Sequence, residues 1–268
     1  MVGQSSENIA SAFPSAVTGE DIARNLAAVR ARIAAACARV GRAPEEVRLL
    51  PVSKTVDEVR IRLAYDAGCR DLGENKVQEA MGKWESMADL VGLRWSVIGH
   101  LQSNKAKYVA RFASEFQALD SLHVAEELDR RLQREGRALD VFVQVNTSGE
   151  ASKYGLAPDQ AAAFIRALPA FTSLHVRGLM TLAALSADQD RVRACFQLLR
   201  SLRAGLQQDA PSGMALHELS MGMSGDFETA IEEGATVVRV GQAIFGARNT
   251  PDKFYWPDAP SSDDASTT

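Results

Sequence analysis

One lysine in this chain follows directly on an apolar segment, a position from which it could do covalent chemistry. Lys54 ends the run VRLLPVSK (47–54), which is short and rich in residues that favour β-strands. A lysine whose stem lies along an apolar lining loses part of its preference for the charged form, and its neutral amine is a nucleophile toward aldehydes. The alternative is a lysine that extends its ammonium group from a strand end into solvent.

Two glycine-containing segments near the C-terminus could bind an anion. In SMGMSGDFETAIEEG (220–234), we expect Ser224 to cap a helix and Gly222 to allow close approach of a phosphate oxygen. Gly241 and Gln242 follow the apolar run TVVRV and open another apolar segment. The alternative is a capped helix and a tight turn without a ligand, because the acidic residues of the first helical turn disfavour an anion.

An arginine interrupts the last apolar run. Arg239 lies in TVVRVG (236–241), and a charge inside a central strand must be paired or functional. Side chains two residues apart share a face of a strand, so we expect Arg239 to point into the same cavity as Gly241, one layer deeper. The alternative is a structural salt bridge to Glu218 or Glu74.

Further polar and sulfur-containing residues follow the apolar runs. Gln144 and Asn146 share one face of a predicted strand, where they could contact a polar ligand or satisfy each other. We expect Met180, Met221 and Met223 to fill space in the core, and Met223 is also a candidate ligand contact because it lies in the anion-binding segment.

Eight such runs alternate with helix-like segments. The runs are 47–54, 71–75, 94–100, 115–121, 139–148, 174–182, 216–224 and 236–241. Alternation predicts parallel strands joined by crossover helices, and eight units in about 200 residues fit an α/β fold of the (β/α)8 TIM-barrel type in a single domain. An open doubly wound sheet is the structural competitor, but no G-x-G-x-x-G follows any run. A barrel would gather the candidate residues, because functional residues lie at the C-terminal ends of its strands.

Helix signals and composition bound the domain. Thr18 with Asp21 three residues later predicts a capping box at the start of a first helix. We expect residues 1–17 and the Pro/Ser/Asp-rich residues 257–268 to be disordered and residues 18–256 to form the barrel.

The charge and cysteine content exclude several classes of protein. Thirty Lys and Arg against 34 Asp and Glu give a net charge of −4, which argues against a general binder of nucleic acid or anionic membranes. We expect no secretory signal, because the first residues have neither a basic start nor an apolar run, and no membrane span, which would need about 18 continuous apolar residues. Three scattered cysteines without a C-x-x-C pair suit a reducing cytoplasm, and four scattered histidines predict no metal site.

The candidate residues together describe a site for a phosphorylated aldehyde. Pyridoxal 5′-phosphate fits this description, because its aldehyde would meet Lys54, its phosphate would meet Ser224 and Gly241, and its pyridine nitrogen would meet Arg239.

At these positions the sequence resembles the pyridoxal phosphate homeostasis proteins, the YggS/PROSC family. The resemblance runs from about residue 19 to residue 248. The matching motifs are VSKT (52–55), LGENKVQEA (72–80), IGHLQSNK (98–105), SMGMSGDFETAI (220–231) and VRVGQAIFGAR (238–248). It implies a barrel of fold type III, like the N-terminal domain of alanine racemase.

The resemblance also implies residue roles and shows three departures from the family pattern. It makes Lys54 the imine lysine, turns Arg239 toward the pyridine nitrogen and places Asn75 in the pocket. The implied phosphate contacts are Ser224, Gly241 and Gln242. The departures are Gln242 where threonine is frequent, Tyr154 in KYGL where many relatives have KSG, and Lys76 where an aromatic residue is common.

The residues favour a carrier over an enzyme. Arginine cannot readily protonate a pyridine nitrogen because its pKa is above about 12, so transamination is disfavoured. A racemase needs acid/base groups on both faces of the substrate carbon. Lys54 is one candidate for these groups. We expect no counterpart of the tyrosine that alanine racemase takes from a second domain, because the residues after the predicted barrel leave no room for one, although Tyr154 or His100 could substitute.

We therefore expect a monomeric cytoplasmic protein that holds pyridoxal phosphate as an imine without turnover of its own. The resemblance adds a role in vitamin B6 and amino-acid homeostasis. Pyridoxal-phosphate-dependent apoenzymes are the candidate acceptors. The alternatives are a fold type III amino-acid racemase and a cofactor-free aldolase that uses Lys54 on a sugar phosphate.

Overall fold

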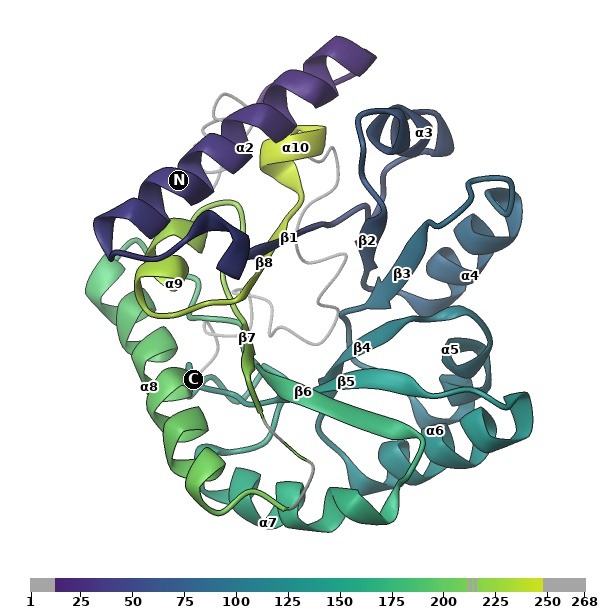
Figure 1. Cartoon of the computed structure of the whole chain (residues 1–268), viewed down its shortest axis with the longest axis vertical. Coiled ribbons are helices and arrows are strands. Elements are labelled where there is room, and N and C mark those ends of the chain that lie inside the picture. The colour runs from purple at the N-terminus through teal and green to yellow at the C-terminus, as the bar shows by residue number, and fades with distance from the viewer. Residues whose placement is uncertain (1–12, 212–213, 215, 248–268) are drawn as a thin grey trace, which may run out of the picture.

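Each apolar run forms a short parallel strand. The structure is a computed structural model that describes residues 13–211, 214 and 216–247, and within them the eight strands make one sheet (Figure 1). The strands are β1 (Arg48–Pro51), β2 (Asp71–Glu74), β3 (Arg94–Val97), β4 (Glu115–Leu119), β5 (Leu139–Gln144), β6 (Leu174–Met180), β7 (Glu218–Ser220) and β8 (Val237–Val240).

The sheet closes into a barrel at β1. The strand order is β1-β8-β7-β6-β5-β4-β3-β2, and each strand is parallel to its neighbours in this order. Val52 completes the ring, because its amide donates to Val240 at 2.9 Å and its backbone bridges to Gly73 of β2. The predicted (β/α)8 barrel is confirmed, and the open doubly wound sheet is excluded.

Helices surround the barrel (Figure 1). The α-helices are α2 (Gly19–Arg39), α3 (Glu58–Asp66), α4 (Val77–Ser86), α5 (Ala106–Phe112), α6 (Leu122–Glu135), α7 (Ala161–Ala167), α8 (Gln189–Gln208), α9 (Phe227–Glu232) and α10 (Gln242–Phe245). Short 3-10 turns lie at Pro44–Glu46, Ser103–Lys105, Pro158–Gln160 and Leu168–Ala170. In the described ranges, no helix combines the length and apolar character that crossing a membrane requires.

The first helix begins as its sequence predicts. The Thr18 hydroxyl accepts a hydrogen bond from the Asp21 amide at 3.1 Å, and the Asp21 carboxylate accepts from the Thr18 amide at 3.2 Å. These bonds, with one from Arg24, lower the pKa of Asp21 to about 2. The capping box is therefore confirmed, and it fixes where α2 enters the outer ring.

The ordered part begins before Thr18. We expected residues 1–17 to be disordered, but Ala16 is 1% exposed and the Phe13 carbonyl accepts a hydrogen bond from the Ala247 amide at 2.8 Å. The expectation is therefore wrong for residues 13–17, because this segment packs against the chain that follows α10. Residues 1–12 and the predicted tail, 257–268, lie outside the described residues.

A pair of glycine substitutions tests the packing of the barrel. A Cβ atom on Gly178 in β6 would lie 1.8 Å from the Glu218 carbonyl oxygen in β7, whereas one on Gly205 in α8 would meet nothing within 4 Å. We expect Gly178→Ala to lower the free energy of unfolding by about 1–3 kcal/mol. Gly205→Ala should raise it by roughly 0.5–1 kcal/mol, because alanine loses less backbone entropy on folding. Urea unfolding of both variants measures the difference, and equal effects would contradict this packing.

Candidate functional site

Lys54 follows the strand that closes the barrel. It is half-buried, and the backbone just before it is paired on both sides: Val52 bonds to β8, and the Ser53 amide donates to the Gly73 carbonyl of β2 at 3.0 Å. The next residue, Thr55, has a left-handed backbone with φ of 64°. That conformation is costly for a β-branched residue, and the Glu79 carboxylate holds it by accepting from the Thr55 amide at 2.7 Å. The Lys54 turn is thus fixed from both sides.

A buried lysine connects the groups that hold this turn. Lys83 of α4 donates from its ammonium to the Ser53 carbonyl and to the carboxylates of Glu74 and Glu79, each at 2.7 Å. Glu74 also accepts from the Ser53 hydroxyl at 2.6 Å. All three ammonium protons are used, so Lys83 anchors both residues that flank Lys54 to β2 and α4.

Glu74 is a buried acid beside the Lys54 turn. The side chain is fully buried, and among the described residues its Oε2 atom has no hydrogen-bond partner. Loss of solvation raises the pKa of Glu74 to about 7, although Lys83 lowers it. Glu74 therefore does not supply the salt bridge to Arg239 that the sequence left open.

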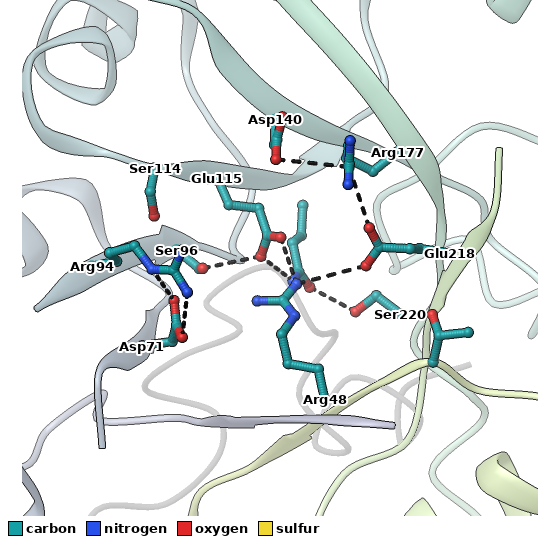
Figure 2. A network of polar contacts seen from close by, with 12 residues as sticks. Arg48, Asp71, Arg94, Ser96, Ser114, Glu115, Asp140, Arg177, Glu218 and Ser220 are labelled. Carbon is teal, nitrogen blue, oxygen red and sulfur yellow. Dashed lines mark hydrogen bonds and ion pairs between the residues drawn. The ribbon is translucent and has the colours of Figure 1, made fainter. Parts of the chain in front are cut away.

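Arg239 is buried with neutral partners. It is 3% exposed, and its guanidinium donates to the Ser220 hydroxyl at 2.6 Å and to the Thr181 carbonyl at 2.8 Å. Among the described residues, no carboxylate lies within ion-pairing distance of it. Glu218 instead pairs with Arg177 at 3.3 Å and lies 4.0 Å from Arg48 (Figure 2). The alternative of a structural salt bridge is therefore wrong.

Burial changes the acidity of Arg239 without removing its charge. Desolvation lowers the pKa of Arg239 to about 10, and the charges of Asp226 and Glu115 oppose that shift. At neutral pH the group is a cation and a hydrogen-bond donor that cannot readily give up its proton.

The loops after β7 and β8 lie against each other. The Ser224 hydroxyl accepts a hydrogen bond from the Ala243 amide in α10 at 3.3 Å. Our expectation that Ser224 caps the following helix is wrong, because α9 begins at Phe227 with Asp226 as its N-cap. The chain forms a turn over 224–226, and that turn delays the helix.

These loops present backbone donors. In the part of the chain that the structure describes, the amides of Ser224, Gly225, Gly241 and Gln242 have no protein acceptor. A Cβ on Gly241 would lie 3.0 Å from the Val52 carbonyl oxygen, so the loop after β8 passes close to the strand that carries Lys54. Open amides on two adjoining loops suit an anion with several oxygens.

The other predicted residues have different places. Asn75 follows β2, and its carbonyl oxygen packs so tightly that a Cβ on Gly99 would lie 2.3 Å away. Met180 and Met221 are buried as expected, but Met223 is 38% exposed in the loop after β7, so its assignment to the core is wrong. Lys76, the N-cap of α4, is exposed.

The two amides of β5 support a loop. Gln144 donates to the Tyr154 carbonyl at 3.0 Å, and Asn146 donates to the carbonyls of Glu150 and Lys153 at 2.8 and 3.2 Å. They neither pair with each other nor project freely as ligand contacts. Their role is to hold the segment that carries Tyr154.

That segment meets the loops after β3 and β4. The ring of Tyr154 stacks on His100 with centroids 3.8 Å apart and planes 8° apart. His100 lies 3.9 Å from the Asp120 carboxylate, which accepts from the Gly155 amide at 3.1 Å. Burial raises the pKa of Asp120, and the charge of His100 opposes that shift. The structure thus brings Tyr154 and His100 together at the C-terminal ends of the strands.

Sequence reasoning missed the residues that hold Lys54 and Arg239. Lys83 lies on an amphipathic helix, where a lysine is normally solvated, and only the acids at the i−4 position and at the end of β2 hinted at a buried role. Ser220 ends β7 and opens the motif 220–231, and Thr181 follows β6, but nothing in the sequence connected either residue with Arg239. Within the described ranges, no cluster of three metal-ligating side chains is present.

Comparisons with known proteins give a consistent result. Residues 24–249 match the family model described as alanine racemase, N-terminal domain. The chain is 44% identical over 228 residues to the pyridoxal phosphate homeostasis protein of Pseudomonas aeruginosa, covering 85% of this chain and 96% of that protein. It is 42% identical over 234 residues to the Escherichia coli K12 protein of the same name, covering 85% and 97%.

Two solved structures extend the comparison. PipY of Synechococcus elongatus, with PLP bound, is 38% identical with a TM-score of 0.74, covering 84% of this chain and all of that chain. Alanine racemase of Clostridium difficile is 15% identical with a TM-score of 0.69, covering 87% of this chain and 58% of that one, and shows the shared fold.

The buried acid beside Lys54 predicts a pH effect on stability. The pKa of Glu74 in the folded protein, about 7, lies above the ordinary glutamate value of 4.5, so folding favours its protonated form. The stability that this carboxyl contributes is present below its unfolded pKa and is lost as the pH rises toward 7. We expect the free energy of unfolding of the wild type, relative to Glu74→Gln, to fall between pH 5 and pH 8. Urea unfolding of both proteins at the two pH values measures this, and a rising difference would contradict the burial of Glu74.

Proposed function

The chain belongs to the family of pyridoxal phosphate homeostasis proteins, and we propose that it binds pyridoxal 5′-phosphate at the C-terminal mouth of its barrel. The bound cofactor would supply an electrophilic aldehyde. Lys54 is the residue proposed to hold that aldehyde as an imine, since the turn on which it lies is fixed from both sides. PipY, the relative with PLP bound, supports the choice of ligand.

One observation carries the proposal. Arg239 is buried and charged, and among the described residues it binds only neutral acceptors, which is costly unless a ligand also uses its charge. A pyridine nitrogen is a neutral acceptor that a guanidinium can meet. Arg239 lies in β8, and the loop that begins at Gly241 follows the same strand. A ligand bound by both would span the C-terminal mouth of the barrel.

The phosphate and ring contacts of the ligand are proposed from the positions of the loops at the barrel mouth. The phosphate is proposed to lie against the open amides of the two adjoining loops, with the Ser224 hydroxyl between them. Gln242 would then act through its backbone, so its departure from the family pattern is tolerated. Asn75 and the exposed Met223 are proposed to flank the ring.

The same geometry supports a carrier rather than an enzyme. Arg239 holds a ring nitrogen without protonating it, and within the described residues no carboxylate adjoins the guanidinium. The proposed role is to hold pyridoxal phosphate and pass it to apoenzymes that need it. A monomeric state and a cytoplasmic location stay predictions, and the free thiols of the three cysteines suit a reducing compartment.

Replacing the lysine tests the covalent site. We expect Lys54→Ala to lose the imine absorption that the wild type shows after incubation with pyridoxal phosphate, because Lys83, the other amine beside the turn after β1, donates all three of its protons to protein acceptors. Borohydride should fix the cofactor to the wild type and not to the variant, as intact mass reveals. The melting temperature of the variant without ligand should stay close to that of the wild type, since Lys54 is half-buried.

Two lysines serve as matched controls. Lys153 donates to the Ala183 carbonyl at 2.8 Å and lies 3.2 Å from Glu150, and Lys105 ends a 3-10 turn before α5. Lys153→Ala and Lys105→Ala should keep the absorption and the label. Finding the borohydride-fixed cofactor on either residue would refute the assignment to Lys54. A native mass without bound cofactor after incubation would instead favour the cofactor-free aldolase.

Proton exchange tests the absence of turnover. Racemisation requires removal of the α-proton of an amino acid, and the nearby stack of Tyr154 on His100 is the candidate second acid/base pair. We expect the loaded protein in deuterium oxide to exchange the α-proton of alanine no faster than free pyridoxal phosphate, as proton NMR measures. Exchange that is much faster, and that is lost in Tyr154→Phe, would establish an enzyme.

A further inference from the structure

A chain of hydrogen bonds crosses the interior of the barrel below Arg239. The Ser220 hydroxyl of β7 donates to the Gln117 carboxamide oxygen of β4 at 2.7 Å. Because β6 and β5 separate these strands in the sheet, this bond spans the inside of the barrel and not a strand ladder. Ser220 and Gln117 are both fully buried.

The chain continues to a carboxylate. Gln117 donates from its amide nitrogen to Glu115 at 2.6 Å, and Glu115 also accepts from the Ser96 hydroxyl at 3.0 Å and from Arg48 at 2.6 Å. Figure 2 shows Glu115 near Ser96 and Arg48, with Ser220 on the β7 side. Glu115 is 7% exposed, so the acid that ends the chain is itself largely removed from water.

The chemistry of the groups sets the direction of every bond. Arg239 has only protons to donate, so the Ser220 hydroxyl accepts from it and must give its own proton to Gln117. The oxygen of Gln117 is then occupied, and its amide nitrogen faces a carboxylate that accepts. Donation therefore runs one way, from the guanidinium to the anion.

This arrangement gives Arg239 an indirect countercharge. A carboxylate in direct contact with a guanidinium commonly takes two of its N–H groups in a bidentate pair. Here Glu115 acts through the neutral side chains of Gln117 and Ser220. Together with Asp226, its charge opposes the lowering of the Arg239 pKa by burial. The hydrogen bond to Ser220 thereby orients the guanidinium. The N–H groups that a directly bound carboxylate would occupy stay available to a ligand.

We propose that Gln117 and Ser220 are positioning residues that orient Arg239 toward an unprotonated ring nitrogen and so determine which heteroaromatic aldehydes the site accepts. The inference rests on the proposed function. It adds that ligand selectivity at Arg239 depends on Gln117 of β4, a strand on the opposite side of the barrel.

The test compares two ligands that differ at one atom. Pyridoxal phosphate and its 1-deaza analogue, in which a C–H group replaces the ring nitrogen, are titrated by absorbance against the wild type. The wild type should prefer pyridoxal phosphate by about tenfold or more, which corresponds to at least about 1.4 kcal/mol for one charged hydrogen bond. In Gln117→Leu and in Ser220→Ala the preference should fall to within about threefold.

Ser96→Ala is the matched control. It removes another buried hydrogen bond to the same Glu115 but leaves the path from Arg239 through Ser220 intact, so it should keep the wild-type preference. Ser220→Ala removes a single hydroxyl and provides the test if Gln117→Leu does not fold. A purely structural role would weaken both ligands equally.

The outcomes separate this inference from the function on which it rests. A preference that is unchanged in both variants, or a wild type that binds the two ligands equally, would overturn the positioning role while leaving cofactor binding intact. A wild type that binds neither ligand would refute the proposed function and this inference with it.

Discussion

Closure of the barrel at its first strand is the constraint on which the site depends. Val52 pairs with β8 on one side and bridges to β2 on the other, so the residues that follow it have little freedom. Lys54 follows Val52, whose carbonyl lies against Gly241, and Ser53, whose hydroxyl donates to the buried acid Glu74. A lysine on a mobile loop would lose backbone entropy on each binding event, whereas the backbone on both sides of Lys54 is already fixed by folding.

Two buried cations are held in different ways, and the difference matches their roles. Lys83 uses every ammonium proton on protein acceptors, two of them carboxylates, and therefore serves only to fix the Lys54 turn. Arg239 has neutral partners and reaches its carboxylate through Ser220 and Gln117. A cation that must meet a ligand is thus oriented without being neutralised by direct contact.

The sequence was sufficient for the fold and for the strand ends at which the candidate residues lie, but not for the groups that support them. Eight apolar runs separated by helical spacing allow few topologies, and the residue that ends each run is placed by the strand itself. Ser224 was misassigned because a turn comes between it and α9, and turn residues and caps share the same residue types. The bond between Ser220 and Gln117 could not be predicted, because it joins strands that are not neighbours and depends on how the barrel closes.

A crystal structure of the protein soaked with pyridoxal phosphate tests the central claim most directly. The account predicts continuous density from Lys54 to the aldehyde carbon, the phosphate against the loops of Ser224 and Gly241, and the ring nitrogen within hydrogen-bonding distance of Arg239. Density for the cofactor at another lysine, or a Lys54 side chain that faces bulk water beyond the reach of any such pocket, would contradict it.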